Sequence, residues 1–236
     1  MMPRIVVDDL PRLQAILATE FQTQAAEVIA RREKFIIALP GGSVASAFFP
    51  TLAALAVDWT RIEVFWIDER AVPPDHPDSN FALASMLLLA PARVPGPRTH
   101  RMYGELPDLE QAARRATDDL KLIAGDPPFI DFVLAGVGDD GHVASIFSDV
   151  GRAGRVLETR HVIPIYDAPK PPARRLTLTL PVLARAGSVV VAAFGASKAA
   201  AMQGALHDSS AVTPIAELLR SAPSSLVLLD RAAGLS

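Results

Sequence analysis

Short, nearly continuous apolar runs alternate along the chain with segments in which apolar residues recur at helical spacing. The runs are FIIAL (35–39), IEVFWI (62–67), IDFVLAG (130–136), VVVAAF (189–194) and SLVLLD (225–230). Helical spacing is found at 10–29, 43–55, 79–90, 108–124, from about 196, and at 212–220. Strands that are apolar throughout are typical of a parallel sheet with both faces covered. The sequence therefore predicts an α/β fold, a doubly wound, mostly parallel sheet with helices on both faces.

The 236 residues are expected to form a single α/β domain over 1–236, since compact domains usually contain ~100–200 residues and neither a linker nor an internal repeat interrupts the pattern. The pattern loosens in the region 148–180, where Gly and Pro are frequent. Within it, HVIPI (161–165) and LTLTL (176–180) are candidate strands. This region is expected to be an irregular insertion or a small subdomain.

Composition narrows the classes of function. The chain has no cysteine, which removes disulfides, thiolate nucleophiles and Cys-ligated zinc. Its net charge of −3 provides no basic field for nucleic acid, and no apolar run approaches the ~20 residues of a membrane span. We expect a cytoplasmic protein that binds neither nucleic acid nor membrane; the oligomeric state is left open, with a monomer favoured.

Four of the predicted strands are followed at once by unusual polar sequence. The segments are PGGS (40–43), DER (68–70), GVGDDGH (136–142) and GASK (195–198). In an open parallel sheet, ligands bind outside the carboxyl ends of the strands, because loops and helix N-termini converge there. We therefore expect these four segments to open onto one crevice.

Two of the segments suggest a phosphate site. Gly41, Gly42 and Ser43 lead into a predicted helix, so backbone N–H groups, a hydroxyl and the helix dipole can meet an anion. Lys198, one of only four lysines among 23 cationic residues, is placed to meet a phosphate as a point charge. The alternatives are an ordinary turn with an N-cap serine and a solvated helix lysine.

The other two segments suggest groups that act on a substrate. Arg70 can hold a carbonyl or hydroxyl oxygen, with Asp68 holding Arg70 or the substrate; a surface ion pair is the alternative. His142, on a glycine-rich loop, can accept a proton from water near neutral pH. Either Asp140 or Asp139 can orient its ring.

Several other chemistries are disfavoured. GVGDDG (136–141) matches the dinucleotide fingerprint and has Glu158 about 20 residues on, but its two aspartates would oppose a pyrophosphate and a helix after it would break near Gly151. Lys198 does not belong to a Walker motif, and no histidine pair has zinc spacing. No G-x-S-x-G elbow is present, so water is the expected nucleophile, with no metal and no cofactor.

Larger blocks of sequence carry a family resemblance. PGGS, FWIDERAVPPDHPDSNF, GVGDDGHVASIF, RRLTLTLPVL and GASKAAAM occur in this order over about residues 10–232. In order and spacing they resemble the 6-phosphogluconolactonases, within the sugar-phosphate isomerase/deaminase superfamily. The resemblance covers nearly the whole chain.

The resemblance implies hydrolysis of 6-phospho-D-glucono-1,5-lactone to 6-phosphogluconate, in the oxidative pentose phosphate pathway, without metal or cofactor. By position, it implies that His142 is the general base and that Arg70 and Asp68 orient the sugar. The implied phosphate clamp contains Gly42, Ser43, Lys198 and one arginine of the pair Arg174–Arg175, for which we take Arg175.

Two rival functions are considered. A 6-phosphohexosamine deaminase or isomerase of the same fold is expected to carry an acidic residue a few positions after the D-G-H element, where this chain has VASIFSDV (143–150). A non-catalytic sugar-phosphate sensor is expected to carry a DNA-binding helix-turn-helix, which the sequence pattern does not indicate.

Overall fold

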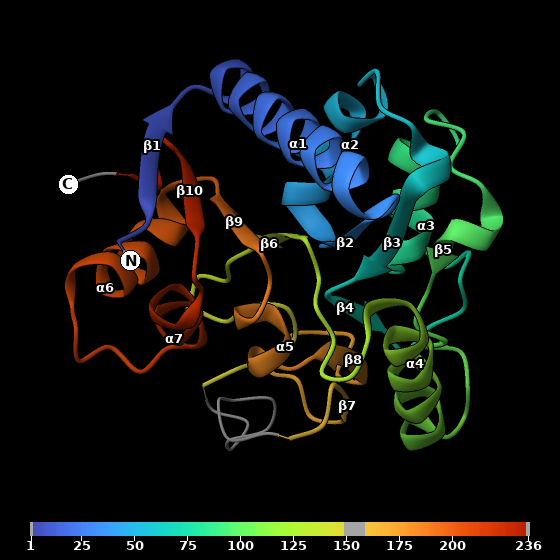
Figure 1. Cartoon of the computed structure of the whole chain (residues 1–236). Helices are drawn as coiled ribbons and strands as arrows, with labels where there is room; N and C mark the ends of the chain where they lie inside the picture. Colours follow the sequence, from blue (N-terminus) through green and yellow to red (C-terminus); the bar gives the residue numbers. More distant parts are fainter. Residues whose placement is uncertain (1, 149–158, 235–236) are drawn as a thin grey trace.

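The computed structural model describes residues 2–148 and 159–234, and its centre is a seven-stranded sheet in which every neighbouring pair is parallel (Figure 1). In spatial order the strands are β1 (Arg4–Asp8), β10 (Ser225–Asp230), β9 (Ser188–Ala193), β6 (Phe132–Gly136), β2 (Phe35–Leu39), β3 (Ile62–Trp66) and β5 (Thr99–His100). The predicted parallel α/β sheet is confirmed.

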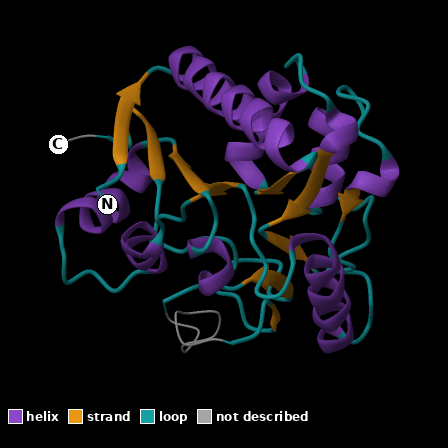
Figure 2. Cartoon of the chain, in the orientation of Figure 1, coloured by secondary structure: helices purple, strands orange, loops and turns teal. Residues whose placement is uncertain are grey.

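Helices cover both faces of this sheet, as Figure 2 shows. On one face lie α1 (Leu10–Arg32), α2 (Gly42–Ala53) and α3 (Asn80–Ala84). On the other lie α4 (Leu109–Ala124), α5 (Leu180–Ala184), α6 (Ala199–His207) and α7 (Pro214–Ser221). Alternate residues of a strand point to opposite faces, so Phe132 and Leu134 pack with the first group and Val133 and Ala135 with the second.

A second, three-stranded antiparallel sheet lies beside the carboxyl ends of the large sheet. It contains β4 (Asp68–Arg70), β8 (Arg175–Leu178) and β7 (Val162–Ile165), and it aligns Arg70 with Arg175. The described part of the region 148–180 therefore contributes two strands, β7 and β8, to a small ordered sheet, and loops and turns connect them. Residues 149–158, including Gly151 and Glu158, lie outside the described residues.

Some elements differ from the sequence-based expectation. The strands β1 and β5 at the two edges of the large sheet were not predicted, because the first is half exposed and the second has only two residues. The helix expected at 79–90 is α3, which continues as a wider helical turn over Ser85–Leu89. Short 3-10 turns lie at Trp59–Arg61, Gly96–Arg98 and Ala196–Lys198. Within the described residues, no helix is long and apolar enough to cross a membrane.

The order in which the chain adds strands to the sheet reverses at its centre. From β2 the chain adds β3 and then β5 on one side, whereas β6 lies on the other side of β2 and is followed outward by β9 and β10. Where strand order reverses in this way, the connections leave toward opposite faces and a crevice forms at the carboxyl ends. The ends of β2 and β6 flank that point.

Candidate functional site

A cavity opens at this reversal point, and residues from all four polar segments line it together with β8. The residues predicted for the site that line the cavity are Gly41, Gly42, Ser43, Asp68, Arg70, His142, Arg175 and Lys198. Asp140 is not among the lining residues but contacts the imidazole of His142. The structure therefore brings these distant segments to one place; the role of each residue stays a prediction.

The imidazole of His142 is held from one side by an aspartate. Its Nδ1 atom lies 2.5 Å from Oδ1 of Asp140, which also accepts the backbone N–H of His142 at 3.2 Å. The ring packs on Phe147 at 4.5 Å between centroids, and its side chain is only 17% exposed. Because Nδ1 is occupied, Nε2 is the nitrogen left for chemistry. Of the two candidate aspartates, Asp140 contacts the histidine.

Two glycines shape the loop that carries this pair. A Cβ atom on Gly138 would collide with Nδ1 of His142 and with the carboxylate of Asp140, so only a glycine leaves room for the two side chains. Gly141 has a φ of +80°, which side-chain-bearing residues rarely adopt, and its carbonyl accepts the N–H of Ile215 at the start of α7. The loop is thus closed on itself and tied to a helix.

Burial and charge set the protonation of the pair. Burial lowers the pKa of His142 below its usual value, although the charge of Asp140 and its hydrogen bond pull the other way. Burial works to raise the pKa of Asp140, but the charge and hydrogen bonds of His142 outweigh it and the pKa of Asp140 lies below its usual value. The preferred state near neutral pH is a neutral imidazole beside a carboxylate, which is the state a general base requires.

The turn between β2 and α2 forms another part of the cavity wall. Gly42, the first residue of α2, has a φ of +63°, and the N-cap Gly41 provides no side chain to bond the first N–H groups of the helix. A Cβ atom on Gly41 would collide with the side-chain amide of Asn80. Uncapped N–H groups at the start of a 12-residue helix favour an anion.

Asp68 is a buried carboxylate in a hydrogen-bonded network. Its carboxylate accepts the hydroxyl of Ser145 at 2.6 Å and the amide of Asn80 at 3.1 Å, and that amide also donates to the Asp68 carbonyl at 2.9 Å. Among the described contacts, none joins Asp68 directly to Arg70, so of its two predicted roles the one of holding Arg70 finds no support there. The network instead reaches Arg175, which donates to the Ser145 hydroxyl at 3.3 Å.

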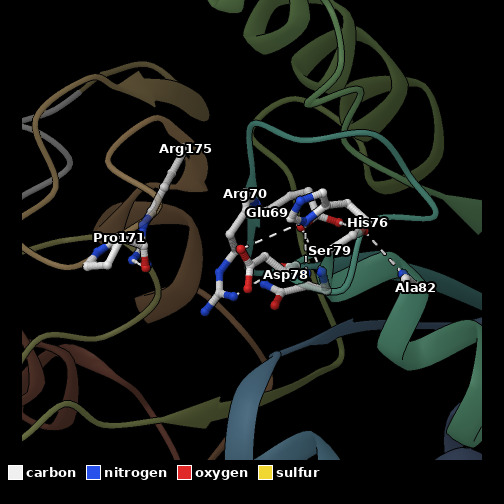
Figure 3. Close-up of polar contacts among 9 residues, drawn as sticks. Glu69, Arg70, His76, Asp78, Ser79, Ala82, Pro171 and Arg175 are labelled. Atoms are coloured by element: carbon white, nitrogen blue, oxygen red, sulfur yellow. Dashed lines mark hydrogen bonds and ion pairs between the residues drawn. The ribbon is translucent and has the colours of Figure 1, made fainter.

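Arg70 is oriented by the loop that follows β4, as Figure 3 shows. Its Nη1 donates to the carbonyl of Asp78 at 3.1 Å, while its Nε is buried and has no hydrogen-bond partner among the described residues. The loop is held in turn by Glu69, whose carboxylate accepts four donors. These are the backbone N–H groups of Arg70, Asn80 and Phe81 and the hydroxyl of Ser79.

Of the two adjacent arginines, the structure brings only Arg175 to the cavity. The residue is 4% exposed, and its guanidinium donates to the carbonyls of Lys170, Pro171 and Pro172. Together with its bond to Ser145, these contacts occupy four of the five N–H donors of a guanidinium. Arg174 points elsewhere and donates to the carbonyl of Pro107. Arg175 therefore brings charge to the cavity with one donor to spare.

The cationic side chains around the cavity outnumber the anionic ones. Among the described residues, Arg70, Arg175 and Lys198 line it, against the single carboxylate of Asp68. Just outside, Lys170 forms an ion pair with Asp139, which accounts for the aspartate that does not contact the histidine. Such an excess of positive charge attracts an anionic ligand to an acidic protein.

The other chemistries considered from sequence find no support in the described residues. The segment 141–148 after the dinucleotide-like motif forms isolated bridges and turns instead of the expected helix. His100 and His161 are bonded to Glu63 and Asp126, and no group of three or more His, Cys, Asp or Glu within residues 2–148 and 159–234 is arranged to hold a metal.

Sequence reasoning missed several residues that build the site. Asn80 and Ser145 complete the Asp68 network, Glu69 holds the loop beside Arg70, and Gly138 makes room for His142. All four lie inside the sequence blocks used for the family resemblance, and that placement was the available signal. Their partners are distant in sequence, so spacing alone does not reveal them.

Known proteins resemble this chain in both sequence and structure. Residues 8–228 match the family described as glucosamine-6-phosphate isomerases/6-phosphogluconolactonase. A 6-phosphogluconolactonase of Mycobacterium bovis is 36% identical over 215 residues, covering 86% of this chain and 85% of the relative. One of Synechocystis is 37% identical over 180 residues, covering 75% and 73%. The solved structure of a Trypanosoma brucei 6-phosphogluconolactonase superposes with a TM-score of 0.85 at 26% identity, covering 99% of each chain. The chain therefore belongs to the family of glucosamine-6-phosphate isomerases and 6-phosphogluconolactonases.

Proposed function

We propose that this chain is a 6-phosphogluconolactonase, which hydrolyses 6-phospho-D-glucono-1,5-lactone to 6-phospho-D-gluconate in the oxidative pentose phosphate pathway. The two relatives reported above carry that name, and this chain matches most of the length of each. The observation that carries the proposal is the placing of a neutral, aspartate-held His142 in the same cavity as Lys198 and the glycine turn of α2.

His142 is the general base in the proposed reaction. Its Nε2 removes a proton from a water molecule as the water oxygen adds to the lactone carbonyl carbon, and the carbonyl oxygen becomes an oxyanion. When this intermediate collapses, the bond between the carbonyl carbon and the ring oxygen breaks. The imidazolium returns its proton to the ring oxygen, which leaves as the C5 hydroxyl, and the product is a carboxylic acid that ionises in water. No electron is transferred, so the step itself requires no redox cofactor.

Arg70 supports the developing negative charge and the orientation of the sugar. Its guanidinium is fixed by the Asp78 carbonyl, and it retains N–H groups with no partner among the described residues. A donor that is held in place before the reaction stabilises an oxyanion without reorganisation. Asp68, fixed by Ser145 and Asn80, is an acceptor for sugar hydroxyl groups.

The phosphate is proposed to bind beside Lys198 and the turn between β2 and α2. Lys198 supplies a mobile positive charge, and Gly42 and Ser43 supply N–H groups and a hydroxyl at the start of α2. Binding of this remote group fixes the lactone carbonyl beside the base, which turns binding energy into rate. Arg175 adds charge and one N–H group at the margin.

The test of the proposed function is acid release from freshly generated phosphogluconolactone, measured above the spontaneous rate and in the presence of a chelator. We expect turnover by the parent enzyme and its near loss in His142→Ala, with binding of 6-phosphogluconate and the unfolding midpoint retained. Turnover of His142→Ala near that of the parent would remove the general-base role. No turnover by the parent would remove the function itself.

The same preparation tests the rival reaction. Residues 143–148 after the D-G-H element carry no acidic side chain, whereas Asp149 and Glu158 lie outside the described residues. We therefore expect no ketose from glucosamine 6-phosphate, and its formation would favour the deaminase or isomerase assignment. The expected cytoplasmic location is part of the proposal and is tested by cell fractionation.

A further inference from the structure

Asp230, the last residue of β10, holds a glycine turn at the edge of the cavity although it does not line the cavity itself. Its two carboxylate oxygens lie 3.0 and 2.9 Å from the backbone nitrogen of Gly195, and one of them also accepts the N–H of Ala233 at 2.8 Å. A carboxylate shared between backbone N–H groups makes charge-assisted hydrogen bonds, which are the stronger kind. Neither the sequence motifs nor the proposed mechanism gives this residue a role.

The glycine that Asp230 holds is the anchor of the turn that carries Lys198. Gly195 has a φ of +88°, in the region that favours glycine, and its carbonyl accepts the N–H of Lys198 at 3.0 Å. The backbone of Lys198 is therefore fixed relative to Gly195, whose own N–H is fixed by Asp230. A lysine side chain is long and flexible, so the position of its backbone decides which points its ammonium reaches.

We propose that Asp230 is a positioning residue, which sets the backbone of the Gly195–Lys198 turn so that Lys198 meets the phosphate of the substrate. The inference rests on the proposed function, because it takes Lys198 as a phosphate ligand. Asp230 acts from the carboxyl end of β10, two places along the sheet from β6 and its catalytic loop. It therefore influences phosphate binding and not the proton transfer at His142.

The alternative is that Asp230 only stabilises the end of the chain. Besides the Ala233 N–H, the Asp230 backbone carbonyl accepts the N–H of Gly234 at 2.9 Å, so the residue also closes a local turn. A residue with this role alone would change the unfolding midpoint and would affect substrate binding in the same way whether or not Lys198 is present. The two roles are therefore separable.

The experiment compares Asp230→Ala and Asp230→Asn with Lys198→Ala and with the double variant Asp230→Ala/Lys198→Ala. KM and kcat are measured for the lactone, the Kd for 6-phosphogluconate by calorimetry, and the unfolding midpoint in urea. Asp8→Asn is the matched control, because Asp8 ends the neighbouring strand β1 in register with Asp230, but its carboxylate contacts the backbone N–H of Asp9 and the guanidinium of Arg231 instead of the Gly195 turn.

We expect Asp230→Ala to raise KM and Kd about tenfold, the scale of one charge-assisted hydrogen bond, with kcat little changed. Asp230→Asn, which keeps one acceptor oxygen, is expected to show a smaller rise and serves if the alanine variant does not fold. The double variant is expected to bind no more weakly than Lys198→Ala alone, and Asp8→Asn to behave as the parent.

The inference would be overturned if Asp230→Ala weakened binding as much in the Lys198→Ala background as it does in the parent. It would also be overturned if Asp230→Ala lowered kcat and left KM unchanged. The inference also fails if Lys198→Ala binds 6-phosphogluconate as the parent does. Lactone turnover by the parent enzyme is read separately, so failure of the proposed function is distinguished from failure of this role for Asp230.

Discussion

Nδ1 of His142 lies 2.5 Å from Oδ1 of Asp140, two residues earlier in the same loop. Because the two residues are so close in sequence, the orientation of the ring depends on the conformation of this one loop, which Gly138 and Gly141 shape. The contact also fixes the proton on Nδ1 and leaves Nε2 as the basic nitrogen. The imidazole is thus prepared before any substrate arrives.

The first prediction concerns Asp140. In Asp140→Asn the amide no longer specifies which nitrogen carries the proton, so we expect kcat to fall about 10²- to 10⁴-fold with little change in KM. The matched control is Asp139→Asn, because Asp139 pairs with Lys170 instead of the histidine. The measurement is initial rate against lactone concentration; equal losses in the two variants would show that the Asp140 contact has no special importance.

The second prediction is the pH dependence of kcat/KM. The proposed base, His142, acts when neutral. Burial lowers its pKa below the usual value of about 6.5, so activity is expected to persist into mildly acidic solution and to fall as pH drops through the lowered pKa. Asp140 opposes this lowering, so the pKa in Asp140→Asn is lower still. The acidic limb of the variant should therefore move to lower pH.

This pH comparison contains its own control. The phosphate of the substrate also titrates near pH 6, but its contribution is common to the parent enzyme and to Asp140→Asn. The difference between their two profiles therefore reports the enzyme group. An acidic limb that stays in place, or moves to higher pH in the variant, contradicts the assignment of the limb to His142.

The third prediction concerns the buried carboxylate of Glu69. It accepts four donors, so the amide of Glu69→Gln, which has nearly the same shape, turns N–H groups toward the N–H of Phe81 or those of Arg70 and Asn80. We expect a loss of about 1–3 kcal/mol in the free energy of unfolding. Urea denaturation measures this loss.

The control is Glu105→Gln, which removes a partly exposed i,i+4 ion pair with Arg101 and should cost under ~1 kcal/mol. Similar losses of unfolding free energy in Glu69→Gln and Glu105→Gln would refute the prediction.

The five inner strands of the large sheet were predictable because they are buried on both faces. FIIAL (35–39) is apolar at every position, and all five of its residues are buried. The small sheet was harder to predict, because β4 is the polar tripeptide Asp68–Arg70, whose strand conformation comes from pairing with β8 more than 100 residues later. Local propensity contains no information about such a partner.

The same distinction applies to the site. His142, Arg70 and Lys198 were predicted to share a crevice because each follows a strand, and parallel strands bring their carboxyl ends together. Asn80 and Asp230 were not singled out, because each acts through a hydrogen bond to a residue on another element. Sequence patterns reveal which residues reach an edge of the sheet, while the residues that hold them in place depend on packing.

The last prediction concerns Gly138, whose backbone is not in the left-handed region, so an alanine there is strained only by its neighbours. In Gly138→Ala the methyl group would occupy the space of Nδ1 of His142, and the ring must turn or shift. A displacement of about 1 Å in a catalytic group costs about 10²-fold in rate, so we expect a loss of that order in kcat with 6-phosphogluconate still bound. Gly96→Ala is the control, because no atom lies within 4 Å of the added Cβ. Parent-like kcat in Gly138→Ala would mean that the imidazole tolerates displacement. The close packing of the His142 ring against Gly138 would then have no part in the reaction.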